Sequence, residues 1–190
     1  MPSAFDVLAS DHEQVKRLLS QFEAAPAASG VNDSLLAARK KMAEVLVIEE
    51  SKHEAAEEMY FWPAVRKLLP DGDKLADQAI GQEQEGKTIL ARLDKLDSGS
   101  PEFDMLLGEF TKAARDHIVF EETKVWPALQ AVITETESFE LGDSLEQARK
   151  TAPTRPHPHT PPSPGVLKTA GPAAAAADRA RDAATGRGRA

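Results

Sequence analysis

Two segments of the chain repeat one pattern, and this repeat restricts how the chain can fold. Residues 53–65 read HEAAEEMYFWPAV, and residues 117–129 read HIVFEETKVWPAL. In each segment a glutamate follows a histidine by four positions, so both side chains lie on one face of a helix. Because such groups are costly to bury without partners, we expect the two helices to turn these faces toward each other.

Turn-forming residues divide the first 134 residues into four amphipathic stretches. They cluster at 25–33, 70–73 and 97–101, which predicts helices over about 3–24, 33–68, 73–97 and 101–134. Short connections make successive helices antiparallel, so the sequence predicts an all-α, up-down-up-down four-helix bundle over residues 1–134. A further short helix is expected within 135–150, against the outside of the bundle.

Polar residues interrupt the apolar stripe of each predicted helix. His12 interrupts the first stripe, and aligning the first helix with the third places Glu83 at the matching point. Buried histidines and carboxylates without a cation would be strongly destabilising, and no Lys or Arg falls on the four stripes. The sequence therefore predicts a metal centre, with six ligands: His12, His53, Glu57, Glu83, His117 and Glu121.

The available ligand atoms restrict the choice of metal. The chain has no cysteine, which excludes disulfides, iron–sulfur clusters and thiolate zinc sites. Imidazole and carboxylate ligands favour iron, with manganese or zinc as weaker alternatives. Six protein ligands would fill every coordination position of a single ion. Shared between two ions, they would leave room for a bridging oxide or hydroxide and for at least one open coordination position.

Several of these features resemble the hemerythrin-like (HHE cation-binding) family over about residues 3–134. The resemblance lies in His12 within ASDHEQVKRLLSQF, in the two His-x-x-x-Glu-Glu segments that end in Trp-Pro-Ala, and in the four helices. It implies a non-haem di-iron centre inside the bundle. It also implies roles, with three terminal ligands, His12, His53 and His117, and two bridging carboxylates, Glu57 and Glu121.

The third helix departs from the family pattern. Members usually carry a histidine there, and this chain has none between residues 73 and 97. Glu83 occupies the corresponding position, or Gln84 if the helix is rotated by one residue. Glu54 and Tyr60 are further candidates to complete the site. A carboxylate in place of the histidine would favour ferric iron, or the change would leave one iron with an extra open position. Either outcome argues against simple reversible carriage of oxygen.

Three functions are compatible with such a centre. The first, which we favour, is binding or sensing of a small species such as oxygen, peroxide or nitric oxide. The second is a catalase-like or nitric-oxide-handling enzyme, and the third is iron storage. Nothing in the sequence indicates a binding pocket for a larger organic substrate.

Charge and composition bear on partners and on the C-terminal segment. The net charge is −8, and residues 151–190 carry six Lys or Arg against two Asp, so residues 1–150 carry −12. This balance argues against a nucleic-acid partner. We also expect no membrane association, a cytoplasmic location and a monomer. Residues 151–190 hold seven of the 13 prolines and few large apolar residues, which predicts a disordered tail.

Overall fold

The computed structural model describes residues 1–25 and 31–188, and every regular element in this part of the chain is helical. Part of the predicted 25–33 loop, residues 26–30, lies outside the described residues. The elements are α1 (Ala4–Ala24), α2 (Asp33–Ala56), η1 (Glu57–Phe61), α3 (Trp62–Leu68), α4 (Gly72–Leu93), α5 (Pro101–Phe120), η2 (Glu121–Val125), α6 (Trp126–Gln130), α7 (Glu135–Thr151) and α8 (Pro164–Thr185).

Local signals set the ends of the bundle helices. The Ser3 hydroxyl accepts from the Asp6 amide, and the Asp6 carboxylate accepts from the Ser3 amide, which forms a capping box. Ser100 accepts from the Phe103 amide at the start of α5, directly before Pro101. These short polar residues satisfy amide groups that a helix leaves unpaired in its first turn.

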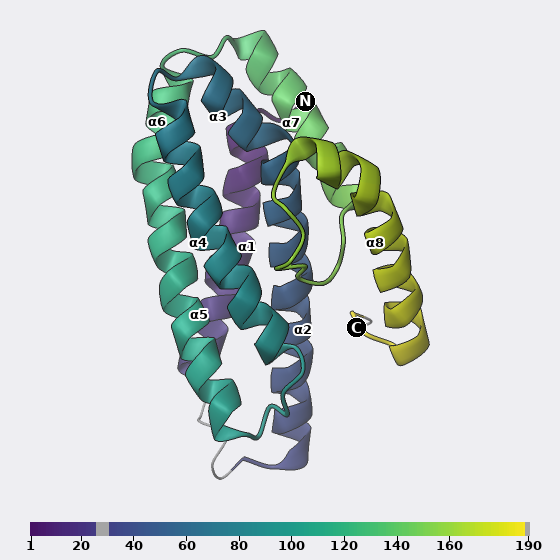
Figure 1. Cartoon of the computed structure of the whole chain (residues 1–190). Helices are drawn as coiled ribbons and strands as arrows, with labels where there is room; N and C mark the ends of the chain where they lie inside the picture. The colour runs from purple at the N-terminus through teal and green to yellow at the C-terminus, as the bar shows by residue number, and fades with distance from the viewer. Residues whose placement is uncertain (26–30, 189–190) are drawn as a thin grey trace.

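The predicted four-helix bundle is confirmed. Helices α1, α2, α4 and α5 lie lengthwise side by side, and α2 and α5 are each extended through a π-helical turn, η1 or η2, and a short helix (Figure 1). Apolar residues form two separate buried clusters, one around Leu8, Trp62 and Trp126 and the other around Leu19, Leu46 and Phe110. Along each bundle helix, the predicted ligands lie at the boundary between these two clusters.

Helix α7 packs closely against the bundle. It contacts α1, α2 and η1, and it buries Leu145 and Ala148 in the first apolar cluster. Gly142 lies so close to the start of α1 that an added Cβ would come within 2.5 Å of the Pro2 carbonyl oxygen. The short helix expected at 135–150 is therefore part of the packed fold and supplies one wall of the core.

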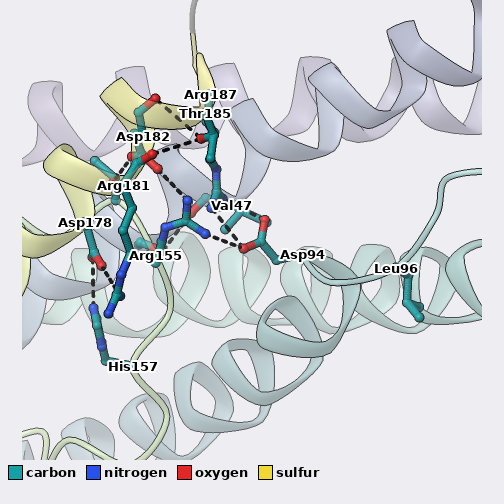
Figure 2. Close-up of polar contacts among 12 residues, drawn as sticks. Val47, Asp94, Leu96, Arg155, His157, Asp178, Arg181, Asp182, Thr185 and Arg187 are labelled. Atoms are coloured by element: carbon teal, nitrogen blue, oxygen red, sulfur yellow. Dashed lines mark hydrogen bonds and ion pairs between the residues drawn. The ribbon is translucent and has the colours of Figure 1, made fainter.

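The structure describes residues 151–188, which we predicted to be a disordered tail, as a loop followed by helix α8. Charge pairs join this segment to the bundle. Arg155 donates to Asp182 at 2.7 Å and to Asp94 at 3.2 Å, and Arg187 lies 2.8 Å from Asp94 (Figure 2). His157 lies 2.9 Å from the fully buried Asp178. Composition alone missed these pairs, which offset the small apolar content of the segment.

In the described residues, every helix is too short or too polar to cross a membrane.

Candidate metal centre

The six predicted ligands lie together in the polar layer between the two apolar clusters. His12 comes from α1, Glu83 from α4, and the two His–Glu pairs come from the α2–η1 and α5–η2 segments. His53 Nε2 lies 3.1 Å from Glu57 Oε2, and His117 Nε2 lies 3.2 Å from Glu121 Oε1. His12 Nε2 lies 3.1 Å from the other oxygen of Glu121. The spacing of four positions thus places each histidine beside its glutamate.

Both repeated glutamates begin a π-helical turn. The amide of Trp62 donates to the carbonyl of Glu57, and that of Trp126 donates to the carbonyl of Glu121, five residues earlier in each case. The proline after each tryptophan explains the wider turn, because its ring would clash with the carbonyl four residues before it. The doubled Trp-Pro pair therefore produces the doubled π-helical turn, a feature often found at functional sites.

The six residues form two groups that share Glu121. The first group is His12, His53 and Glu121, and the second is Glu57, Glu83, His117 and Glu121. Within each group, one ligand atom from every residue lies within 4.8 Å of the others. A carboxylate has two oxygens, so a shared glutamate can serve two neighbouring ions at once.

The side-chain atoms of this layer fit cations better than they fit one another. Both carboxylate oxygens of Glu57 and of Glu121 are buried without a hydrogen bond, as is Nε2 of His12 and of His117. Some of these atoms approach within 3.1–3.2 Å, yet their angles do not make hydrogen bonds. Buried polar atoms without partners are rare, and imidazole nitrogens with carboxylate oxygens are ligands that metal ions bind.

Burial and mutual repulsion shift the pKa values of the carboxyl groups. Burial raises the pKa of Glu57, and the charge of Glu121 raises it further. Burial also raises the pKa of Glu83 well above its ordinary value, and Glu57 adds to the effect. Burial opposes the charged form of Glu121 too, but His117 and His12 outweigh it and hold the pKa of Glu121 below its usual range. Of these three carboxyl groups, only Glu121 therefore has neighbours whose positive charge outweighs its burial.

The pKa of His117 shows the same coupling from the other side. Burial disfavours the imidazolium form of His117, but the Glu121 carboxylate beside it prevails and raises the pKa of His117 to about 9. Because a histidine binds a metal through its neutral form, binding of a cation here must displace a proton.

Glu83 takes the place at which the family resemblance led us to expect a histidine. One of its oxygens accepts from the indole N–H of Trp62 at 2.5 Å, and the other has no hydrogen-bond partner. Trp62 follows the first π-helical turn directly, so the repeat that carries His53 and Glu57 also orients Glu83. The alternative, Gln84, is half-buried, and its side-chain nitrogen is buried without a hydrogen bond.

Two other candidate ligands lie outside the two groups. Tyr60 packs at the edge of the first apolar cluster, with Lys168 Nζ 4.6 Å from the centre of its ring. Glu54 is buried, and burial raises its pKa to about 8. The structure therefore gathers the six predicted ligands and leaves Tyr60 and Glu54 aside.

One premise drawn from the sequence was wrong, because a lysine is buried close to the centre. Lys87 on α4 is 7% exposed and donates to Glu58 at 2.5 Å. Lys87 follows Glu83 by four positions on α4, and both residues are buried inside the bundle. The ammonium group of Lys87 contacts Glu58. It acts on Glu54 and Glu83 only through space, where its charge partly opposes the rise in their pKa values.

The outward nitrogens of the histidines have partners of their own. His12 Nδ1 lies 3.0 Å from Glu122 Oε1, which also accepts from Lys16 at 2.8 Å. His117 Nδ1 lies 3.0 Å from the amide oxygen of Gln82. A partner that accepts from Nδ1 fixes the ring and leaves Nε2 free to bind a metal. Gln82 does not stand out in the chain by spacing or charge, so the sequence does not predict it as a partner of His117.

The fold and the site together define a helical-bundle protein with a histidine and glutamate site for cations, and comparisons with known proteins identify its family. The profile of the hemerythrin HHE cation binding domain matches residues 3–129. An uncharacterized hemerythrin-like protein of Schizosaccharomyces pombe is 30% identical over 137 residues, which cover 72% of this chain and 68% of that protein. The chain belongs to the hemerythrin HHE cation-binding family.

A solved structure supports the fold beyond the matched domain. A hemerythrin HHE cation binding domain-containing protein from Mycobacterium kansasii is similar to this chain, with a TM-score of 0.64 at 24% identity. The likeness covers 94% of this chain and 99% of that chain. It therefore extends past residue 129 into the C-terminal helices.

Proposed function

We propose that the polar layer binds two iron ions and that this centre binds a small species such as oxygen, peroxide or nitric oxide. The observation that carries the proposal is the pair of ligand groups joined by Glu121, each with buried atoms that have no protein partner. One group has two histidines and one has a single histidine, so the two ions would differ in their surroundings. Nitrogen and oxygen ligands without sulfur favour iron over softer metals.

The protein residues have separate tasks in this proposal. His12, His53 and His117 would hold the ions, and the carboxylates would come from Glu57 and from Glu121, which belongs to both ligand groups. When bound, the iron pair supplies redox chemistry and a place for a small ligand. The ring of Trp126 stacks on His12, with centroids 4.9 Å apart and an angle of 15° between the planes. This apolar cover restricts water on that side of the centre.

Catalase-like turnover of peroxide is the second candidate, and Glu83 is the observation that favours it. A third buried carboxylate beside Glu57 and Glu121 adds negative charge, which stabilises the ferric state relative to the ferrous state. Ready reversible carriage of oxygen requires a stable ferrous form, whereas turnover requires access to both oxidation states.

The two candidates are separated by adding peroxide to the iron-loaded protein. Sustained evolution of oxygen, measured with an electrode, would establish turnover. A colour change under oxygen that reverses under vacuum would establish binding alone. Failure of the purified chain to take up about two irons when reconstituted anaerobically would contradict the proposal as a whole.

A further inference from the structure

The outward side of His53 is held by a contact chain that ends on α7. His53 Nδ1 lies 3.3 Å from Asp11 Oδ2, and the other oxygen of Asp11 lies 2.8 Å from Nη1 of Arg149. Arg149 reaches Glu49 as well, with Nη2 3.3 Å from Oε2. Arg149 thus connects α7 to α1 and α2 at the level of the candidate metal centre.

This arginine lies outside the part of the chain that the family profile matches. The profile ends at residue 129, and α7 begins at Glu135. The same helix buries Leu145 and Ala148 against the bundle, which keeps the backbone near Arg149 in place. The family domain alone therefore does not contain the cation that faces Asp11.

We propose that Arg149 is a positioning residue for the metal centre, acting through Asp11 to set the orientation of His53. This inference rests on the proposed function, since it assigns His53 as a ligand. Its new element is that a helix beyond the family domain holds one of the ligands in its binding geometry.

The burial of Asp11 gives the physical reason. Asp11 is 5% exposed, so its carboxylate needs partners for both oxygens. Arg149 holds one oxygen, which leaves the other directed at Nδ1 of His53. A histidine whose Nδ1–H donates to a carboxylate presents Nε2 to the metal and binds it more tightly. Without Arg149, the Asp11 side chain could turn away and the ring would lose its fixed orientation.

The other two histidines show that this arrangement is specific to one ligand. Behind His12, Lys16 on the same helix faces Glu122, so that contact chain lies within the family domain. Behind His117 the partner is the neutral amide of Gln82. The loss of Arg149 should therefore affect the ligand group that contains His53 and spare the group that contains His117.

The test compares Arg149→Gln, Arg149→Lys and the parent in the full-length chain. Anaerobic Fe²⁺ is titrated against a competing colorimetric chelator, and bound iron is counted. We expect Arg149→Gln to weaken one of the two ions by about 10–100-fold, the usual effect of removing such an outer partner. Arg149→Lys should recover most of this affinity, because it restores the positive charge.

Two further variants separate positioning from general stability. Glu49→Gln removes the other partner of Arg149 and should leave both affinities within about twofold, whereas Asp11→Asn should match Arg149→Gln. The double variant of Asp11 and Arg149 should be no weaker than either single variant, because both act on one ring. Thermal unfolding of the metal-free proteins reports any loss of folding separately from the loss of affinity.

The outcomes distinguish this inference from the proposed function. A parent chain that binds no iron would overturn both. A parent that binds two ions, together with a folded Arg149→Gln variant of unchanged affinity, would overturn only the role of Arg149. Equal weakening of both ions, or failure of Arg149→Lys to recover affinity, would show a structural role and would also overturn it.

Discussion

Replacing Glu57 by glutamine should stabilise the metal-free protein and weaken the metal-loaded one. Both oxygens of Glu57 are buried without a hydrogen bond, and the side chain is 0% exposed. Burial and Glu121 together raise its pKa, which means that the charged form is unfavourable in the metal-free fold. Glutamine keeps the size of the side chain and removes the charge.

The magnitude follows from the cost of the buried charge, because glutamine leaves polar atoms at the same place and removes only the charge. Each unit by which burial and Glu121 raise the pKa of Glu57 corresponds to about 1.4 kcal/mol, and the metal-free Glu57→Gln variant should gain a stability of this order. In a chain of this size each kcal/mol raises the melting temperature by about 2–4 °C. Metal loading stabilises the parent by about 2.7 kcal/mol for each site when the free ion is at a hundred times its Kd. The variant should lose most of this gain.

The neighbouring Glu58 provides the matched control. It is 3% exposed, but unlike Glu57 it is paired with the buried Lys87. Removing its charge leaves Lys87 without a partner, and breaking a buried pair costs about 3–5 kcal/mol. Glu58→Gln should therefore destabilise the metal-free protein while the gain on metal loading persists. Two adjacent buried glutamates are thus expected to give opposite results.

The assay is thermal and urea unfolding of parent and variants, each metal-free and after anaerobic loading with Fe²⁺. We expect the parent and Glu57→Gln to exchange their order of stability on loading. A metal-free Glu57→Gln variant that is less stable than the parent, and that still gains the full stabilisation from iron, would refute it.

Three further predictions follow from other parts of the structure. His117→Ala should lower bound iron from about two to about one per chain, as counted by elemental analysis, because its ligand group has only one histidine. The metal-free protein should lose stability in urea as pH rises from about 6.5 to 9. The fold raises the pKa of His117 from 6.5 to about 9, so protonated His117 stabilises the fold fully below pH 6.5, and this stabilisation is lost as pH rises to about 9. The raised pKa of Glu54, about 8, has the same sign, since its neutral form is favoured in the fold below that pH. Asp94→Asn should speed hydrogen exchange in α8 and leave iron content unchanged, because Asp94 pairs with two arginines of the C-terminal segment, far from the ligand groups.

The bundle and the gathering of six ligands could be predicted because both depend on local spacing. Turn residues marked most helix ends within a few positions, and the four-residue step put His53 with Glu57 and His117 with Glu121. The depth of α7 and the order of α8 could not be predicted in this way. They depend on a close approach at Gly142 and on pairs such as Arg155 with Asp182, whose partners lie far apart in the sequence.

The repeat also suggested an equivalence that the structure does not have. His53 and His117 begin the same motif, yet a charged carboxylate, Asp11, faces the outer nitrogen of one, and a neutral amide, Gln82, faces that of the other. An anionic partner makes an imidazole a stronger ligand than a neutral one does. The difference arises from α1, α4 and α7, which the repeated motif does not include. Repeated ligands therefore specify which atoms meet the metal, while the surrounding helices determine how strongly each one binds.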